Sequence, residues 1–372
     1  MKYCRCKFPS DWLSTGTQHR TLATRTIPSL PRHRAQSQNF NILNSTNNST
    51  RGFSKTSLRY RAHPTQNFSL RPTPAVQALS KGQTSLHTTA TKEPTIHHIF
   101  ESVTGTWQYI VADSSTQTAA IIDPVLNYDP VTQAITTDSA DALLSLIEEK
   151  GYKIERILET HAHADHLTAA SYLQRKLTRK QGYKPPIGIG KRIEQVQKLF
   201  GQRYGIQSEE YETVFDKLFE DEEFFQIGNV TAKAIHLPGH TPDHLGYQIG
   251  GTARCDFPGG DAKDLFQSSR KLLALDDHVK IWPGHDYPPE GRDSPIPWLS
   301  VADHRKQNKH VGDVVSEKEF VALRTERDAK LNAPRLLHQS LQVNIRAGQL
   351  PKPLDSGYRI LRLPLKLNGL EW

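Results

Sequence analysis

Short apolar segments and amphipathic segments alternate along the chain from about His97 onward. Short apolar runs bounded by turn-forming residues predict strands, and apolar residues spaced three and four apart predict helices. The predicted elements are strands at 107–112, 119–122, 153–158, 187–189, 230–237, 245–249 and 279–282, and helices at 141–150, 167–179, 191–200, 263–274, 316–330 and 336–347. An extended tail begins at Leu350. This alternation is typical of a layered α/β fold.

The basic residues are concentrated near the N-terminus. The 372-residue chain has a formal net charge of +8, but residues 1–92 contain 14 Lys or Arg residues and one acidic residue, Asp11. The remainder is therefore net negative. It has no basic stripe with interleaved aromatic residues, so we expect no nucleic-acid partner. No apolar run of about 18 residues occurs, which predicts a soluble protein without a membrane span.

Residues 1–92 are rich in Arg, Ser, Thr, Asn and Gln and lack the apolar core of a secretory signal. This composition is typical of a mitochondrial presequence and predicts import into the matrix, although basic tails without a targeting role have a similar composition. We therefore predict three regions: the presequence-like segment at 1–92, a globular domain at 93–295, and a C-terminal helical extension with a tail at 296–372.

The segment at 160–166, with the sequence THAHADH, carries the candidate chemistry. It follows a predicted strand, at the end of a strand where α/β sheets place ligand sites. On an extended backbone His161 and His163 point to the same side, and we expect Asp165 and His166 at the turn into the next helix. The alternative is a group of surface histidines with a helix-capping aspartate. Three histidines and an aspartate in six residues favour a metal site.

Two further segments place a histidine after a predicted strand. Each has a Pro-Gly-His turn, which puts His240 after the strand at 230–237 and His285 after the strand at 279–282. A single histidine after a glycine is more often a solvated turn residue. Because the arrangement recurs at two strand ends, we predict that both histidines join the cluster of 160–166.

The HxHxDH motif followed by two strand-end histidines resembles the metallo-β-lactamase superfamily over about residues 97–290. The resemblance implies an αββα sandwich. It also implies two metal sites, one formed by His161, His163 and His240 and the other by Asp165, His166 and His285. Hydrolases similar to glyoxalase II fill both sites with zinc or iron and use a bridging hydroxide.

Within the superfamily, the chain most resembles the persulfide (sulfur) dioxygenases, also called ethylmalonic encephalopathy proteins. The segments that carry this narrower resemblance are Arg254-Cys255-Asp256-Phe257, Pro283-Gly284-His285-Asp286-Tyr287, Ala333-Pro334-Arg335-Leu336 and Leu350-Pro351-Lys352-Pro353. The resemblance implies one Fe(II) held by His161, His240 and a carboxylate, with positions left for water, O₂ and the substrate sulfur. The implied substrate is glutathione persulfide.

In this subgroup the other candidate ligands, His163, Asp165, His166 and His285, would orient the iron ligands and water. Arg254 is the candidate substrate-binding residue, because a guanidinium group pairs well with a carboxylate of glutathione. An ordinary surface salt bridge is the alternative role for Arg254.

The chain departs from the family pattern directly after the strand at 245–249. The family's third ligand is an Asp in a Gly-Asp turn, and here Gly250 leads within a few residues to Arg254 with no such turn. About 10–20 residues, one strand and its connection, are missing. We expect weaker metal binding and an uncovered strand edge. A skipped exon explains the departure most simply, and Asp256 and Asp261 are the nearest acidic substitutes.

Three functions therefore remain open from the sequence. The first is an Fe(II)-dependent persulfide dioxygenase, impaired in this form. The second is a dinuclear hydroxyacylglutathione hydrolase similar to glyoxalase II, with zinc as the alternative metal. The third is a non-catalytic protein that keeps the fold without a complete site. The oligomeric state is open, with a homodimer among the alternatives.

Overall fold

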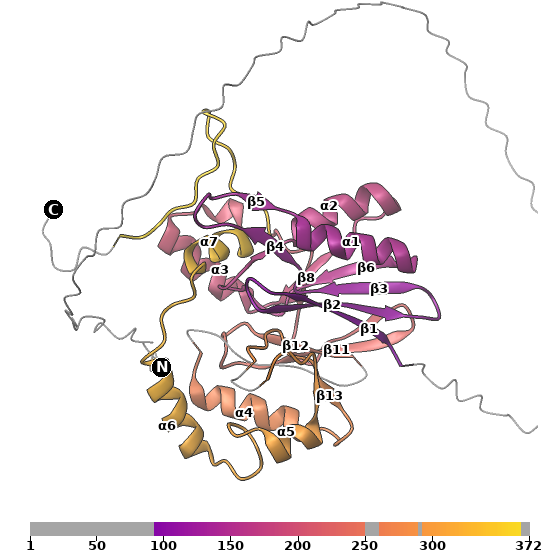
Figure 1. Ribbon diagram of the computed structural model, residues 1–372. Coiled ribbons are helices and arrows are strands. Elements are labelled where there is room, and N and C mark those ends of the chain that lie inside the picture. The colour runs from indigo at the N-terminus through magenta and orange to yellow at the C-terminus, as the bar shows by residue number, and fades with distance from the viewer. Residues whose placement is uncertain (1–92, 250–259, 289–291, 366–372) are drawn as a thin grey trace, which may run out of the picture. The chain divides into compact units, whose positions relative to one another are not determined.

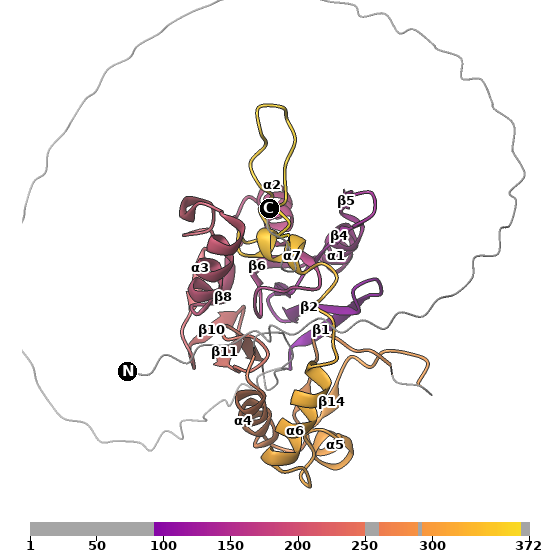
Figure 2. The same ribbon diagram turned by 90° about the vertical axis from the view of Figure 1, so that its left-hand side faces the viewer.

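The computed structural model describes residues 93–249, 260–288 and 292–365. Two β-sheets lie face to face, and helices cover the outer face of each sheet (Figures 1 and 2). The helices above are α1 (Asp138–Lys150), α2 (Ala170–Gln181), α3 (Ile193–Tyr204) and α7 (Leu337–Asn344), and those below are α4 (Ala262–Leu273), α5 (Val301–Gln307) and α6 (Glu317–Asp328). The predicted αββα sandwich is therefore confirmed.

The upper sheet has six strands in the order β1-β2-β3-β6-β8-β9. These strands are β1 (Thr95–Glu101), β2 (Thr106–Asp113), β3 (Thr118–Ile122), β6 (Lys153–Leu158), β8 (Ile187–Gly190) and β9 (Lys217–Phe219). The first three pair antiparallel, and β3, β6, β8 and β9 run parallel. The carboxyl ends of parallel strands lie at the same edge of a sheet. The segment that follows Leu158 of β6 therefore lies at the edge where α/β proteins form ligand sites.

The lower sheet has fewer strands than the upper sheet within the described residues. It contains β10 (Phe224–Ile227), β11 (Val230–His236) and β12 (Leu245–Ile249), in that order. Val111, Leu158, Phe219 and Tyr247 pack between the two sheets and form the inner core. Among the described residues β12 pairs with β11 alone, and residues 250–259, where the sequence departs from the family pattern, lie outside the described residues.

Short elements complete the described part of the chain. They are β4 (Val125–Tyr128), β5 (Ile135–Thr136), β7 (Leu167–Thr168), a 3₁₀ helix at Ser208–Glu210, β13 (Lys280–Ile281) and β14 (Leu299–Ser300). Three of them form a small sheet in the order β5-β4-β7. Among the described residues, no helix is both long and apolar enough to span a membrane.

The prediction of a helix over 167–179 is wrong at its start. Leu167 and Thr168 are extended and pair with β4, and helix α2 begins at Ala170. Both residues are buried, so pairing with β4 satisfies backbone groups that a first helical turn would leave without partners. Asp165 and His166 consequently precede a strand, and do not lie at the turn into the helix.

Helix α7 belongs to the main core although it comes from the C-terminal part of the chain. Leu341, Val343 and Ile345 are fully buried in the cluster that includes the upper sheet and helices α1 and α2. Figure 2 shows α7 beside the helices of the upper layer. Helix α7 therefore lies next to the loop between β6 and β7, although more than 150 residues separate the two segments in sequence.

Asp261, one of the two acidic substitutes considered for the missing ligand, has a structural role. It is the N-cap of α4, where its Oδ1 accepts hydrogen bonds from the amides of Lys263 and Asp264, and it is exposed. Capping fixes its carboxylate at the helix end. Asp256, the other substitute, lies outside the described residues.

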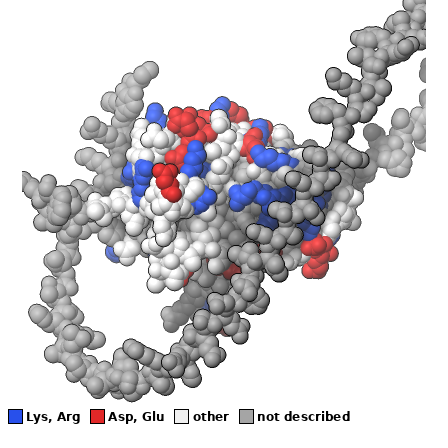
Figure 3. Space-filling view, turned by 90° about the horizontal axis from the view of Figure 1, so that it is seen from above, with Lys and Arg blue, Asp and Glu red and all other residues white. Residues whose placement is uncertain are grey.

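Seen from above the upper helices, the surface carries both charges. Figure 3 shows Lys and Arg side chains beside Asp and Glu side chains, and neither sign covers this face alone. Mixed surface charge of this kind is common in globular proteins.

Candidate metal centre

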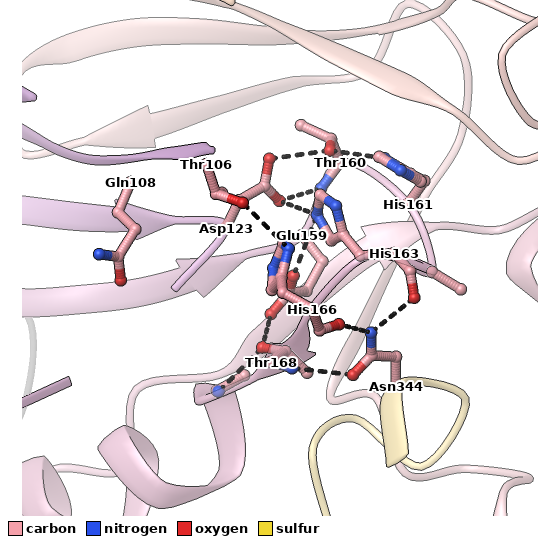
Figure 4. Close-up of polar contacts among 12 residues, drawn as sticks. Thr106, Gln108, Asp123, Glu159, Thr160, His161, His163, His166, Thr168 and Asn344 are labelled. Carbon is pink, nitrogen blue, oxygen red and sulfur yellow. Dashed lines mark hydrogen bonds and ion pairs between the residues drawn. The ribbon is translucent and has the colours of Figure 1, made fainter. Parts of the chain in front are cut away.

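The loop between β6 and β7 supplies three of the histidines. Asp123, which follows β3, holds the start of this loop: one carboxylate oxygen accepts the Thr160 amide and the other accepts the Thr160 hydroxyl, both at 2.8 Å. His161, His163 and His166 then lie buried on this loop, with exposed fractions of 5%, 1% and 0%. Figure 4 shows the two hydrogen bonds and the grouped imidazoles.

His240 reaches the same place from the turn after β11. Its Nε2 lies 3.1 Å from Nε2 of His161. The turn depends on Gly239, whose φ is +117° and whose Cβ, if it had one, would lie 2.2 Å from the Leu265 amide nitrogen of α4. A residue with a side chain would not fit there. Two imidazole nitrogens at this separation have the spacing of neighbouring ligands on one ion.

His285 is positioned by the upper sheet. It forms an isolated antiparallel bridge with Thr106, and the Trp107 amide donates to the Gly284 carbonyl at 2.7 Å. Its Nε2 lies 3.2 Å from Oδ2 of Asp165, and that oxygen is also 3.2 Å from Nδ1 of His166. The structure therefore brings together all six of the predicted ligands.

The outward-facing nitrogens of the histidines have separate neighbours. His161 Nδ1 lies 2.9 Å from the Thr160 hydroxyl, His163 Nε2 lies 3.0 Å from Asp123 Oδ1, and His285 Nδ1 lies 3.1 Å from the Gly105 carbonyl. Such contacts fix the ring orientation and the tautomer of a metal ligand. In each ring the other nitrogen remains to face the cluster.

Two of the inward nitrogens lack a hydrogen-bond partner among the described residues. They are Nδ1 of His163 and Nε2 of His166, both fully buried. Orphaned buried polar atoms are destabilising, and a divalent cation would satisfy them. With Asp165, these two histidines also form a group whose ligand atoms lie within 4.8 Å of one another. The residues present therefore fit a metal ion.

A second group of possible ligands was missed by the sequence analysis. Asp123, Glu159 and His163 place one ligand atom each within 4.8 Å of one another, and all three are buried. Burial and the neighbouring Asp123 charge raise the pKa of Glu159 to about 8, so this carboxyl is mostly protonated at pH 7. The signal in the sequence was an aspartate directly after the apolar strand at 119–122, at the same sheet edge as the motif.

Asn344 of α7 was also missed. Its Nδ2 donates to the carbonyls of His163 and His166, and its Oδ1 accepts the Thr168 amide, each at 2.8 Å (Figure 4). A single buried side chain therefore joins both ends of the segment that carries His163 and His166. An isolated asparagine in a C-terminal helix gave no signal in the sequence.

A pocket opens over the cluster. Tyr109, Val111, Tyr247 and Trp282 form apolar walls, and His161, His163, His240, His244 and His285 lie among its lining residues. Apolar walls around a few polar groups are typical of small-molecule sites. Arg254, the predicted substrate-binding residue, lies outside the described residues.

Comparison with known families matches residues 102–253 to the metallo-β-lactamase superfamily. Glyoxylase B2 of Dictyostelium discoideum is 43% identical over 283 residues, which cover 71% of this chain and 94% of that protein. This chain belongs to the metallo-β-lactamase superfamily. A probable metallo-hydrolase of Burkholderia pseudomallei is 40% identical over 298 residues, covering 73% of this chain and 99% of the relative.

Some relatives of lower sequence identity are named for a more specific activity. The human mitochondrial persulfide dioxygenase ETHE1 is 28% identical over 207 residues, covering 52% of this chain and 68% of that protein. The crystal structure of ETHE1 from Myxococcus xanthus matches with a TM-score of 0.53 at 23% identity, covering 68% of this chain and all of that chain. That structure supports the fold. Members of the superfamily are usually metal-dependent hydrolases or related enzymes, and the fold implies a divalent metal.

Proposed function

We propose that the protein is an Fe(II)-dependent dioxygenase that oxidises glutathione persulfide in the mitochondrial matrix. The observation that carries the proposal is the pair of facing nitrogens, Nε2 of His161 and Nε2 of His240, 3.1 Å apart beneath the pocket. Two histidines with open positions suit a non-haem iron site. The human relative named above supports the substrate class and the compartment.

In this reaction one O₂ and one water are consumed for each persulfide. The outer sulfur gives up four electrons to O₂ and leaves as sulfite, and glutathione is released as the thiol. When bound, Fe(II) supplies the redox chemistry that brings O₂ and sulfur together. The remaining requirements fall to the protein itself.

The chain contributes binding, orientation and exclusion of water. His161 and His240 would hold the ion, and Asp123 fixes the loop that carries His161 through its two hydrogen bonds to Thr160. Tyr109 and Trp282 wall the pocket and shield the persulfide from bulk water. Arg254 is proposed to pair with a carboxylate of glutathione.

The test is oxygen uptake. Purified full-length protein is loaded anaerobically with Fe(II), and O₂ consumption with glutathione persulfide is recorded together with sulfite formation. We expect uptake that depends on iron and is lost in His240→Ala. His278→Ala, a change at an exposed histidine in the turn after α4, serves as the matched control and should retain uptake. No uptake by the loaded protein, even after a Gly-Asp hairpin is inserted behind Ile249, would exclude this function.

A dinuclear thioester hydrolase is the second candidate. It is favoured by the group of His163, Asp165 and His166, with His285 Nε2 3.2 Å from Asp165, because this arrangement offers a second metal site. The names of the more similar relatives, Glyoxylase B2 and metallo-hydrolase, also favour it. If each chain binds two metal ions and the protein cleaves S-lactoylglutathione, the hydrolase proposal replaces the dioxygenase proposal. A metal-free protein without either activity would support the non-catalytic alternative.

A further inference from the structure

The pocket over the candidate metal centre continues between the two sheets that Figure 1 shows one above the other. Asp123, Thr160 and the histidines form its polar lining. Apolar side chains from the inner faces of both sheets form much of the rest. The empty space inside it, counted out to the open mouth, is about 730 Å³, which is in the range of small-molecule sites.

Backbone pairing orders the upper wall of the pocket. Tyr109 pairs with Ile122, and Asp123, which follows Ile122, lies 3.0 Å from His163, so this pair of residues is next to the histidines. Val111 lies two residues further along β2 and pairs with Ile96 of β1. Val111 and Ile96 therefore line the pocket roughly 7 Å farther from the histidines.

Strand β12 forms the lower wall in the same order. It begins at Leu245, directly after His244, and Tyr247 and Ile249 follow at alternate positions that face the same side. Ile249 lies four residues beyond Leu245, roughly 13 Å along the strand. Val111, Tyr247 and Ile249 belong to one apolar cluster between the sheets. The end of the pocket away from the histidines is therefore enclosed by hydrocarbon from both sheets.

The tyrosines of the pocket present their rings more than their hydroxyl groups. The Tyr247 hydroxyl donates to the Glu159 carbonyl at 2.7 Å, and the Tyr109 hydroxyl donates to the Pro283 carbonyl. Each hydroxyl group thus already has a backbone partner. The aromatic carbons remain to contact a ligand.

This end of the pocket suits an uncharged hydrocarbon group. None of its described lining residues is a lysine or an arginine. A carboxylate placed between the sheets would lose its water without gaining a charged partner, which is costly. Glutathione has two carboxylates, so its peptide arms are unsuited to this end. An alkyl group instead gains contact with Val111 and Ile249 as it leaves water.

We propose that the end of the pocket formed by Ile96, Val111 and Ile249 is a binding site for an alkyl group carried on the substrate sulfur. The substrate class then includes alkyl persulfides as well as glutathione persulfide. One O₂ and one water are again consumed, the outer sulfur leaves as sulfite with two protons, and the alkyl thiol is released. The inference rests on the proposed function for the position of the sulfur at His161 and His240.

The experiment measures how tightly alkyl thiols, the expected products, bind as their chain grows. Propanethiol, butanethiol, pentanethiol and hexanethiol are titrated into the metal-free full-length protein, and dissociation constants are obtained by ligand-observed NMR. Each buried CH₂ contributes about 0.8 kcal/mol, so we expect binding to tighten about fourfold with each added carbon. Dissociation constants that stay the same along the series overturn the inference.

Two variants show whether the chain enters this pocket. Ile96→Trp should fill the far end and weaken hexanethiol binding by at least about tenfold, the equivalent of about two buried CH₂ groups. Ile135→Trp, a change at an exposed isoleucine of β5, is the matched control and should bind like the wild type. If Ile96→Trp does not fold, Val111→Ile adds one methyl group at the same end and should weaken hexanethiol more than propanethiol. Unchanged hexanethiol binding in a folded variant of either kind overturns the inference.

The inference and the proposed function fail in different ways. Oxygen uptake with glutathione persulfide, in a protein whose thiol binding does not depend on chain length, overturns the alkyl site and leaves the proposed function standing. Binding that tightens along the series and is lost in Ile96→Trp, in a protein without oxygen uptake, overturns the proposed function and leaves the alkyl site standing.

Discussion

The proton on His163 links metal binding to pH. Burial lowers the pKa of His163, but the neighbouring Asp123 carboxylate outweighs burial and raises the pKa to about 9. Burial and the adjacent His163 and His240 instead keep the pKa of His161 well below 6.5. In the metal-free protein at pH 7.5, His163 is therefore protonated and His161 is neutral.

An ion that binds through Nδ1 of His163 must displace a proton. We expect metal affinity to rise by about tenfold per pH unit until pH approaches about 9, because one proton is released for each ion bound. His161 has no proton to lose in this range and adds no pH dependence. Calorimetric titrations with Zn(II) at pH 6.8 and 7.8, in buffers of different ionisation enthalpy, measure the affinity and the proton count. Equal affinities at the two pH values would show that His163 is not a ligand.

Asp123 influences the candidate metal centre through its contacts with Thr160 and His163. It holds Thr160 by two hydrogen bonds and lies 3.0 Å from His163, so Asp123→Asn removes the charge while keeping the shape. Compared above about pH 9, where proton release from His163 no longer contributes, we expect metal affinity to fall about 10- to 100-fold, as is typical when a residue that orients a ligand is changed. The loss of the charge should also lower the pKa of His163 and reduce proton release on binding. Asp276→Asn, at an exposed turn position, is the control. Wild-type affinity in Asp123→Asn would contradict the prediction.

At the scale of elements, helix α7 supports the loop between β6 and β7, which carries His161, His163 and His166. Asn344 bonds to the carbonyls of His163 and His166 and to the Thr168 amide, and it is 3% exposed. In Asn344→Ala these buried groups lose their partner, at about 1–3 kcal/mol for each unsatisfied group. We expect a lower melting temperature of the metal-free protein and weaker metal binding. Gln349→Ala removes an exposed amide just after the same helix and should leave both unchanged.

The outcome for Asn344→Ala is measured by thermal denaturation and by metal titration of the same samples. A loss of stability with unchanged metal affinity would mean that α7 supports the fold without orienting the loop. Rescue of metal affinity by Asn344→Gln is not expected, because the longer side chain cannot reach all three backbone groups from the same position on α7.

At the scale of the whole molecule, the presequence-like segment and the metal centre are separate in sequence. All of the candidate ligands, from His161 to His285, lie beyond residue 92. We expect deletion of residues 1–92 to leave the metal content unchanged and to abolish delivery to mitochondria. A fluorescent protein fused behind residues 1–92 should enter mitochondria, since a basic, acid-poor segment is what import recognises. Diffuse cytosolic fluorescence of the fusion would contradict this prediction.

The local pattern predicted much of the fold. The strands at Lys153–Leu158 and Leu245–Ile249 have the predicted bounds, because a short apolar run between turn formers specifies a buried strand wherever it lies. The start of the helix predicted at 167 was wrong because pairing with β4, more than 35 residues earlier, decides the conformation of Leu167 and Thr168. The strands β1, β4, β5, β9, β10 and β14 were not predicted, and several of them are short or half-buried.

By itself, the sequence determined that candidate metal ligands would gather around 160–166, since three histidines and an aspartate in six residues are unusual for any other purpose. The tertiary structure alone decided which residues support that cluster. Asp123 and Asn344 are single polar residues without a motif, and each gains its role from backbone segments that meet it in space. Local composition cannot predict these tertiary contacts, because they depend on the register of strands and on the packing of a helix from the C-terminal part of the chain.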